Sequence, residues 1–288
     1  MLRGVILAGG ASTRYGKLKI LQRVSGKPVL LRVIEATREY TGEVLVIASP
    51  HTTRDVKRLV EGKAGGYNEV KVLRDENPLP CQGPIRGIVT SLIYVTPWSR
   101  EDEILVAPGD APWLTSGSLE LIHSFSKRLA AQVAVPVDAL GNIYLPFLYV
   151  NNSVFREVLS ACYLRAGNSR ATDVLRVANR LALLGYGLVA GENSLSMVTF
   201  NRPEDLEKPQ EPKQLNASIL VVGGGNLFGE AYRREAMGDR VGAFSLYHEE
   251  YALYKSLGLK ILEKHVCRDL ERIQNSTYAC RALMETEL

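Results

Sequence analysis

Candidate phosphate-binding residues begin directly after a short apolar run, Val5 to Ala8. Gly9 and Gly10 follow at once. A loop of this kind lets backbone N–H groups approach phosphates, because glycine has no side chain in the way and tolerates positive φ. Arg14 and Lys19 add two cations within reach of the loop: a guanidinium suits forked recognition of a phosphate, and an ammonium acts as a point charge. Both cations are needed if the ligand is a nucleoside triphosphate, whose charge must be neutralised during phosphoryl transfer.

A carboxylate is the second candidate. Asp110 ends an apolar stretch and lies between Pro108 and Pro112. A carboxylate fixed at the end of a strand is well placed to hold a hard cation such as Mg²⁺ against triphosphate oxygens. The alternative is that Asp110 caps the helix predicted to begin near Thr115. On the residues alone, both interpretations stay open.

Three further polar residues stand at or near other expected strand ends. Asp75 follows an alternating stretch, and its alternative is an exposed turn. Asn201 offers a neutral oxygen that can contact metal-bound phosphates. Arg86, in a string that begins Gly83-Pro84, either reaches a phosphate of a second substrate or is merely solvated, and the residues do not decide between the two.

Strand and helix patterns alternate along the first two-thirds of the chain, and these elements must position the candidates. Repeated strand–helix units of this length imply a mostly parallel sheet with helices on both faces. Ligands of such sheets bind beyond the carboxyl ends of the strands, where the Gly9-Gly10 loop, Asp75 and Asp110 would lie. The expected strands are residues 5–8, 43–48, 69–73, 103–107, 133–137 and 144–149, and the expected helices are residues 29–40, 53–61, 87–94 and 116–129.

The composition changes between residues 207 and 216, where the chain is polar, contains two prolines and lacks apolar periodicity. We interpret this segment as a linker. It separates an expected α/β domain, residues 1–206, from a mainly helical C-terminal region of unknown role, residues 217–288. In that region three tyrosines have helical spacing and are expected to pack on a partner helix; they are Tyr247, Tyr251 and Tyr254.

Composition places the 288-residue chain among ordinary globular proteins, with 46% hydrophobic and 23% charged residues. Its formal net charge of +4 is too small to argue for a nucleic-acid partner. No apolar run approaches the roughly 20 residues that cross a bilayer, and the opening run breaks at Gly9, unlike a secretory signal. None of the cysteines, Cys81, Cys162, Cys267 and Cys280, belongs to a C-x-x-C pair. We expect a cytoplasmic protein with free thiols and no membrane partner.

The spacing of the first loop fits neither G-x-G-x-x-G nor G-x-x-x-x-G-K-[ST]. The string from Leu7 to Lys19, followed by Gly26-Lys27-Pro28, instead resembles L-A-G-G-x-S-x-R-M-G-x-D-K and G-K-P-L. That signature belongs to the molybdenum-cofactor guanylyltransferases, which are MobA-like nucleotidyltransferases. Later strings are similar to further motifs of the family: the string at Gly83 to G-P-L-A-G, that at Asp110 to D-x-P, and that at Asn201 to N-x-N-T-P-E-D-L.

The resemblance, over residues 4–206, implies a three-layer α/β/α, Rossmann-like nucleotidyltransferase domain. It implies that a phosphate of molybdopterin attacks the α-phosphate of GTP, so that GMP is transferred and pyrophosphate leaves. In the family the aspartate of D-x-P binds Mg²⁺, a role that Asp110 inherits, and Asp75 matches a position that contacts guanosine. The catalytic residues so implied are Arg14, Lys19 and Asp110, and the nucleotide-binding residues are Leu7, Ala8, Gly9, Gly10, Ser12, Asp75, Gly83 and Asn201.

Several positions depart from the family pattern. Tyr15 replaces a methionine, and Leu18 replaces the aspartate before the lysine. Pro50 stands where the guanylyltransferases tend to carry an asparagine that reads the base, and Thr199 replaces another asparagine. The choice of base and the strength of any activity are therefore open.

Other functions are kept as alternatives. Molybdopterin cytidylyltransferases share the fold and a P-G-D-x-P string like that around Asp110, cobinamide-phosphate guanylyltransferases share the opening glycine pair, and a sugar 1-phosphate is a further acceptor. A catalytically silent nucleotide sensor or scaffold is motivated by Leu18 and by the altered string at Asn201. The C-terminal region has no counterpart in the resemblance and is a candidate surface for a homo-oligomer or for a partner in molybdoenzyme maturation.

Overall fold

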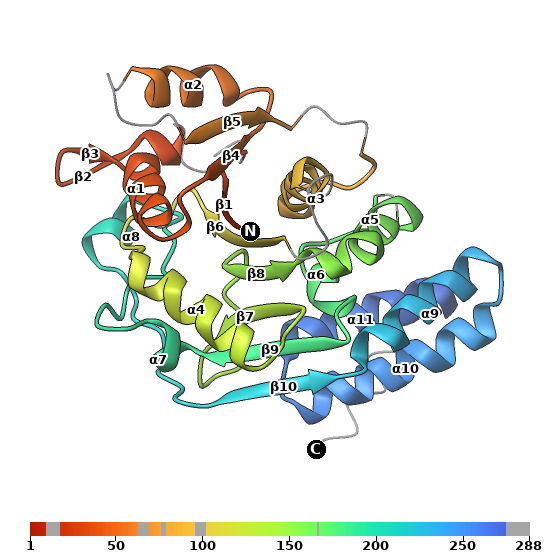
Figure 1. The fold of residues 1–288 in the computed structure, drawn as a ribbon. Coiled ribbons are helices and arrows are strands. Elements are labelled where there is room, and N and C mark those ends of the chain that lie inside the picture. Colours follow the sequence, from red (N-terminus) through yellow and green to blue (C-terminus); the bar gives the residue numbers. More distant parts are fainter. Residues whose placement is uncertain (10–17, 63–68, 76–78, 96–101, 166, 275–288) are drawn as a thin grey trace.

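An eight-stranded sheet forms the middle layer of the protein (Figure 1), whose computed structural model describes residues 1–9, 18–62, 69–75, 79–95, 102–165 and 167–274. Its strands are β1 (Leu2–Leu7), β4 (Val44–Ala48), β5 (Val70–Arg74), β6 (Glu103–Pro108), β7 (Val133–Val137), β8 (Leu148–Asn151), β9 (Arg180–Gly185) and β10 (Ser218–Val222). The strand order is β10-β9-β7-β8-β6-β1-β4-β5. Strand β1 pairs in parallel with β4 and β6, as do β4 with β5 and β7 with β9, whereas β8 and β10 pair antiparallel with their neighbours. The predicted mostly parallel sheet is confirmed.

Helices cover both faces of the sheet, as predicted. The helices of one face are α1 (Val29–Thr41), α2 (Thr53–Glu61), α4 (Ser116–Arg128) and α7 (Tyr186–Val189). Those of the other face are α3 (Pro84–Val95), α5 (Phe155–Leu164), α6 (Asp173–Arg176), α9 (Gly224–Ala236), α10 (Arg240–Ser256) and α11 (Lys260–Gln274). The described chain also contains α8 (Pro203–Glu207), the 3-10 helices η1 (Lys19–Leu21) and η2 (Asn152–Val154), and the hairpin of β2 (Arg23–Val24) and β3 (Lys27–Pro28). None of the described helices combines the length and the apolar character that a bilayer span requires.

Strand β1 shows why the sheet is buried between two layers. Val5 and Ile6 are both fully buried, but they belong to different hydrophobic clusters, because successive side chains of a strand point to opposite faces. Gly4 lets α1 lie close to the strand: a Cβ at this position would be 2.2 Å from Cγ2 of Thr37. Strand β1 is therefore an interior strand between β4 and β6, and its carboxyl end leads to Gly9.

The strand predicted at residues 144–149 begins too early. Strand β8 starts only at Leu148, and the segment before it contains the cis peptide bond Leu145–Pro146. Proline has no N–H to donate to a strand ladder, and the Tyr144 N–H donates to the Pro136 carbonyl of β7 at 3.0 Å. Residues 145–146 form a turn, so β8 does not extend back over residues 144–147.

The expectation of free thiols is wrong. Cys81 and Cys162 form a disulfide with their Cα atoms 5.1 Å apart, and Cys267 is disulfide-bonded as well. Cys280 lies outside the described residues. Cys81 and Cys162 are 81 residues apart in the sequence. A pair this distant leaves no local spacing pattern, so the sequence did not predict the disulfide.

The C-terminal region is helical, as predicted, and it also contributes a strand. Strand β10 pairs antiparallel with β9 and forms one edge of the same sheet. Tyr247, Tyr251 and Tyr254 are buried in the core shared with α3 and α5, which confirms their predicted packing. The linker at residues 207–216 and the two regions that it separates stay predictions about domain organisation; the two regions share one sheet and one core.

A buried ion network fastens the C-terminal helices to the rest of the protein. The Arg176 guanidinium in α6 donates to both carboxylate oxygens of Glu250 in α10 at 2.7 Å, and to Asp269 in α11 at 2.8 Å. The same guanidinium lies 4.1 Å from the centroid of the Phe228 ring in α9. Arg165, which follows α5, donates to Asp269 at 2.8 Å. Charges withdrawn from water depend on such partners, so the three helices and the α5–α6 segment pack as one unit.

We expect Glu250→Ala to lower the free energy of unfolding by about 3–5 kcal/mol, because it leaves the fully buried Arg176 without its two-oxygen partner. Chemical denaturation measures this change. Glu230→Ala is the control, since Glu230 makes only exposed pairs with two arginines of α9, and it should leave the stability unchanged within error. Equal stability of the two variants would show that the network does not hold the C-terminal helices.

Candidate functional site

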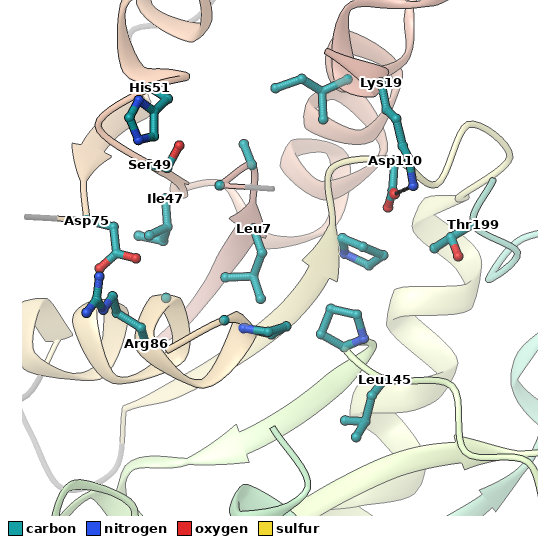
Figure 2. Close-up of a pocket in the computed structure, with 18 of the residues that line it drawn as sticks. Leu7, Lys19, Ile47, Ser49, His51, Asp75, Arg86, Asp110, Leu145 and Thr199 are labelled. Carbon is teal, nitrogen blue, oxygen red and sulfur yellow. Dashed lines mark ion pairs between the residues drawn. The ribbon is translucent and has the colours of Figure 1, made fainter. Parts of the chain in front are cut away.

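A cavity of about 590 Å³ opens at the carboxyl ends of β1, β4, β5 and β6, where a sheet of this type binds its ligands. Figure 2 shows Lys19, Asp110 and Thr199 on one side of it, and Ser49, His51, Asp75 and Arg86 on the other. Of the predicted site residues, those that line this cavity are Leu7, Ala8, Gly9, Lys19, Asp75, Gly83 and Asp110.

Lys19 joins three segments that are far apart in the sequence. Its ammonium lies 3.6 Å from Oδ2 of Asp110, at the end of β6. It also donates to Oδ1 of Asn201 at 2.7 Å and to the carbonyl of Phe200 at 3.1 Å. The three predicted residues Lys19, Asp110 and Asn201 therefore meet at one point beside the cavity. Asn201 is held there from the other side, because its backbone N–H donates to Asp205 at 2.6 Å.

Asp110 is not the cap of the following helix. The side chain of Thr115 accepts the hydrogen bond from the Ser118 N–H and caps α4, so the capping interpretation of Asp110 is wrong. Burial raises the pKa of the Asp110 carboxyl, and the nearby Lys19 ammonium opposes that rise. The carboxylate therefore lies in a poorly solvated place where a cation stabilises its charged form.

The donor set around Asp110 fits a hard cation that brings most of its own ligands. Asp110 and Asn201 supply oxygen atoms, the donors that Mg²⁺ prefers. Over the described part of the chain, no group of three or more His, Cys, Asp or Glu side chains is arranged to hold a metal ion. One carboxylate beside a cavity nevertheless matches the usual Mg²⁺ arrangement, in which substrate phosphates and water complete the coordination.

The end of β1 is held in place by both of its neighbours. The Ala8 N–H donates to Ile47 at 2.8 Å, and the Gly109 N–H donates to the Leu7 carbonyl at 2.9 Å. The Ala8 carbonyl accepts the hydroxyl of Thr52 at 2.9 Å. These bonds fix the start of the predicted phosphate loop, whose first member in the cavity wall is Gly9. The other predicted loop residues, Gly10, Ser12 and Arg14, lie outside the described residues, as does Tyr15.

The far side of the cavity is built from the segment that joins β5 to α3. Asp75 is half-buried and accepts the Thr90 hydroxyl at 3.0 Å, so it is not an exposed turn residue. Burial raises the pKa of Asp75, and the Thr90 hydrogen bond and the Arg86 charge oppose the rise. Arg86 itself donates to the carbonyls of Cys81 and Leu79 at 2.8 and 3.0 Å. These two hydrogen bonds hold the Arg86 guanidinium within the wall of the cavity.

The cavity is also lined by residues that no motif predicted. Ser49, Pro50 and His51 follow β4, and the rule that ligands lie at the carboxyl ends of parallel strands could have found them. Leu145 and Pro146 also line the cavity, but no motif marks them, and their place depends on the turn before β8. Pro50 and Thr199 had been noted only as departures from a family pattern.

Comparison with known proteins connects this site to one family. The family model described as the MobA-like NTP transferase domain matches residues 4–182. A "Probable molybdenum cofactor guanylyltransferase" of Thermococcus gammatolerans is 33% identical over 208 residues, 71% of this chain and 97% of the relative. A protein of the same description from Pyrococcus horikoshii is 29% identical over 211 residues, again 71% of this chain and 97% of the relative.

The fold has a counterpart among solved structures. The crystal structure of molybdopterin-guanine dinucleotide biosynthesis protein A from Archaeoglobus fulgidus superposes with a TM-score of 0.57 at 17% identity, covering 72% of this chain and 95% of that one. At this identity the likeness concerns the fold alone.

We expect Thr52→Val to destabilise the protein by about 1–3 kcal/mol, because the buried Ala8 carbonyl loses its hydroxyl partner. We also expect weaker binding of nucleoside triphosphates, because the carbonyl lies at the start of the glycine loop. Denaturation and titration calorimetry measure the two effects. Thr37→Val, which removes a buried hydroxyl away from the cavity, should leave binding unchanged; unchanged binding in Thr52→Val would show that this bond does not position the loop.

Proposed function

This chain belongs to the MobA-like NTP transferase family, and from that premise we propose that it transfers GMP from GTP to the phosphate of molybdopterin and releases pyrophosphate. The observation that carries the proposal is the convergence of Lys19, Asp110 and Asn201 beside the cavity that Gly9 also lines. The descriptions of the relatives from Thermococcus and Pyrococcus support the choice of acceptor and of nucleotide.

The transfer requires that the two substrates be positioned and that the negative charge of their phosphates be neutralised. The attacking phosphate of the acceptor is already ionised, so no nucleophilic side chain or general base is needed. A new P–O bond forms at the α-phosphate of GTP, the bond to the β-phosphate breaks, and the electron pair leaves with pyrophosphate. Lys19, with Arg14 as the second cation, offsets the negative charge that crowds at this point.

We assign the remaining residues roles according to the side of the cavity on which they lie. Gly9, with Gly10 and Ser12, offers backbone N–H groups to the phosphates. Asp110 would hold Mg²⁺, which supplies charge stabilisation on the phosphate oxygens and a template for their orientation. On the opposite side, Asp75 lines the cavity and would accept N–H donors of guanine, since a carboxylate is an acceptor with two oxygens.

The test is pyrophosphate release with GTP, CTP, ATP or UTP, each with Mg²⁺ and with either molybdopterin or cobinamide phosphate. We expect release with GTP and molybdopterin only. Release with CTP would place the protein with the cytidylyltransferases and would give Pro50 a meaning, since it stands where a base-reading asparagine is expected. Release with cobinamide phosphate would change the acceptor and leave the chemistry intact.

A second candidate is a silent nucleotide sensor, which the departures at Leu18 and Thr199 favour. Asp110→Ala separates the two: an enzyme should lose about 100-fold or more in turnover while its affinity for GTP changes far less. Glu120→Ala, an exposed carboxylate on α4, serves as the control and should keep full turnover. A wild-type protein that binds GTP without turnover under any pairing would support the sensor.

A cytoplasmic location, and a second copy or a maturation partner bound through the C-terminal helices, stay predictions from the sequence. The proposed reaction requires neither this location nor such a partner.

A further inference from the structure

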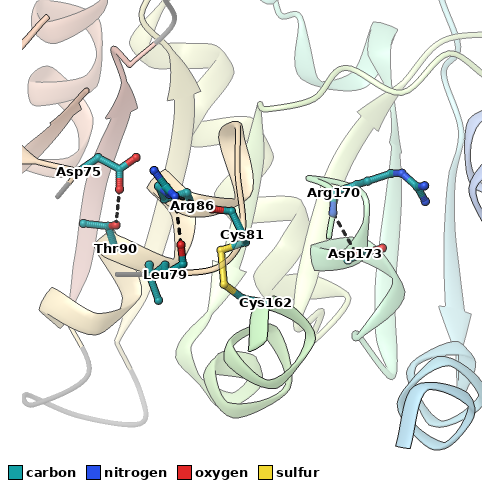
Figure 3. Close-up of a disulfide and its surroundings, with 8 residues drawn as sticks. All are labelled: Asp75, Leu79, Cys81, Arg86, Thr90, Cys162, Arg170 and Asp173. Carbon is teal, nitrogen blue, oxygen red and sulfur yellow. Dashed lines mark hydrogen bonds between the residues drawn. A yellow bond between two sulfur atoms is a disulfide. The ribbon is translucent and has the colours of Figure 1, made fainter. Parts of the chain in front are cut away.

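The loop of residues 79–83, between β5 and α3, is held from two directions (Figure 3). Its last residue, Gly83, lines the cavity, and so do Pro84, Arg86 and Gly87 of the helix that follows. Gly83 has φ of +69°, a conformation that favours glycine. The loop and the first turn of α3 therefore form one wall of the cavity, on the side of Asp75.

The first attachment is covalent. The Cys81–Cys162 disulfide ties the middle of the loop to α5, and both cysteines are fully buried. Helix α5 lies on the same face of the sheet as α3 and belongs to the same hydrophobic cluster. With the bond intact, the loop cannot move away from the core without taking α5 with it.

The second attachment is the Arg86 guanidinium. Its Nε donates to the Cys81 carbonyl at 2.8 Å, and its Nη2 donates to the Leu79 carbonyl at 3.0 Å. The Arg86 backbone N–H also donates to the Gly83 carbonyl at 3.1 Å. A planar guanidinium spans two acceptors in a fixed geometry, so the side chain pins the loop against the start of its own helix.

The same helix also carries the partner of the acidic residue in this wall. Thr90, one turn beyond Arg86 in α3, donates to the Asp75 carboxylate at 3.0 Å. Figure 2 shows the Asp75 and Arg86 side chains close together at the cavity edge. A displacement of α3 or of its loop would therefore shift Asp75 and Gly83 together.

We infer that the Cys81–Cys162 disulfide and Arg86 are positioning groups that build the nucleoside side of the cavity before the nucleotide binds. The inference rests on the proposed function, because it explains how that site gains affinity for a nucleotide. Neither group needs to touch the reacting phosphates, which we place on the opposite side with Lys19 and Asp110. Their contribution is therefore to binding rather than to the transfer step.

The expected effect follows from the cost of ordering a loop on binding. A loop already fixed in its bound conformation loses no freedom when the ligand arrives. Cys81→Ser/Cys162→Ser and Arg86→Ala should therefore each raise the Kd and the KM for GTP by about three- to tenfold, with kcat little changed. Arg86→Lys should restore part of the affinity, because an ammonium keeps the charge but not the fork.

Direct titration of GTP with Mg²⁺, without acceptor, measures the Kd, and pyrophosphate release separates KM from kcat. Reductant alone would act on two bonds, since Cys267 is disulfide-bonded as well, so the paired serine variant isolates one of them. Val158→Ala is the control: it truncates a buried side chain in α5, the helix that carries Cys162, and should lower the melting temperature without moving the Kd.

A combined variant tests whether the two attachments act on one loop. If they do, adding Arg86→Ala to the paired serine variant should raise the Kd by less than the product of the two separate effects. A Kd unchanged in both separate variants, with only the melting temperature lowered, would overturn the inference and leave the proposed function standing. Alkylation of Cys81 and Cys162 in the native protein without reductant would also overturn the inference, because only free thiols are alkylated.

The proposed function and the inference fail in different ways. If GTP binds and the variants weaken it, but no pairing with an acceptor releases pyrophosphate, the inference holds and the proposed function falls. If the wild-type protein binds none of the four nucleotides, both fall.

Discussion

The contact on which the candidate site depends is the approach of the Lys19 ammonium to Asp110, with Asn201 on its other side. A carboxylate withdrawn from water resists ionisation, and burial does raise the pKa of Asp110. The nearby lysine opposes that rise, because its positive charge favours the ionised carboxylate. The same ammonium also donates to the Phe200 carbonyl. It therefore links Lys19, near the start of the chain, to the last segment of the expected α/β domain.

The two sides of the cavity are built by different forces. The side of the cavity where we propose that the phosphates bind depends on charge, with the Lys19 ammonium close to Asp110. The opposite side, proposed for the nucleoside, depends on a disulfide and on hydrogen bonds from Arg86 and Thr90. This division suits a nucleotidyltransferase, in which one part of the substrate must be recognised and another must react.

The C-terminal helices lie on the face of the sheet that carries α3 and α5, and the fully buried Arg176 connects them to it. A buried guanidinium is costly unless every partner stays in place, so this packing leaves little freedom for separate motion. Through α5 the same layer reaches Cys162 and the loop that it holds. The C-terminal helices, which lie beyond the family match at residues 4–182, thus pack in the layer that carries α3 and α5.

Hydrophobic periodicity and short strings are local properties, so the sequence alone predicted most of the strands and helices up to residue 137. It also drew attention to Gly9, Lys19 and Asp110, which the structure brings to one cavity. It also placed Asp75 and Gly83, since parallel strands bring their carboxyl ends to one edge. The Cys81–Cys162 bond, the hydrogen bonds of Arg86 within its loop and the burial of Arg176 became visible only in the folded chain. These depend on contacts between segments that are distant in the chain, or on which of several polar neighbours a side chain meets, and no local pattern encodes either.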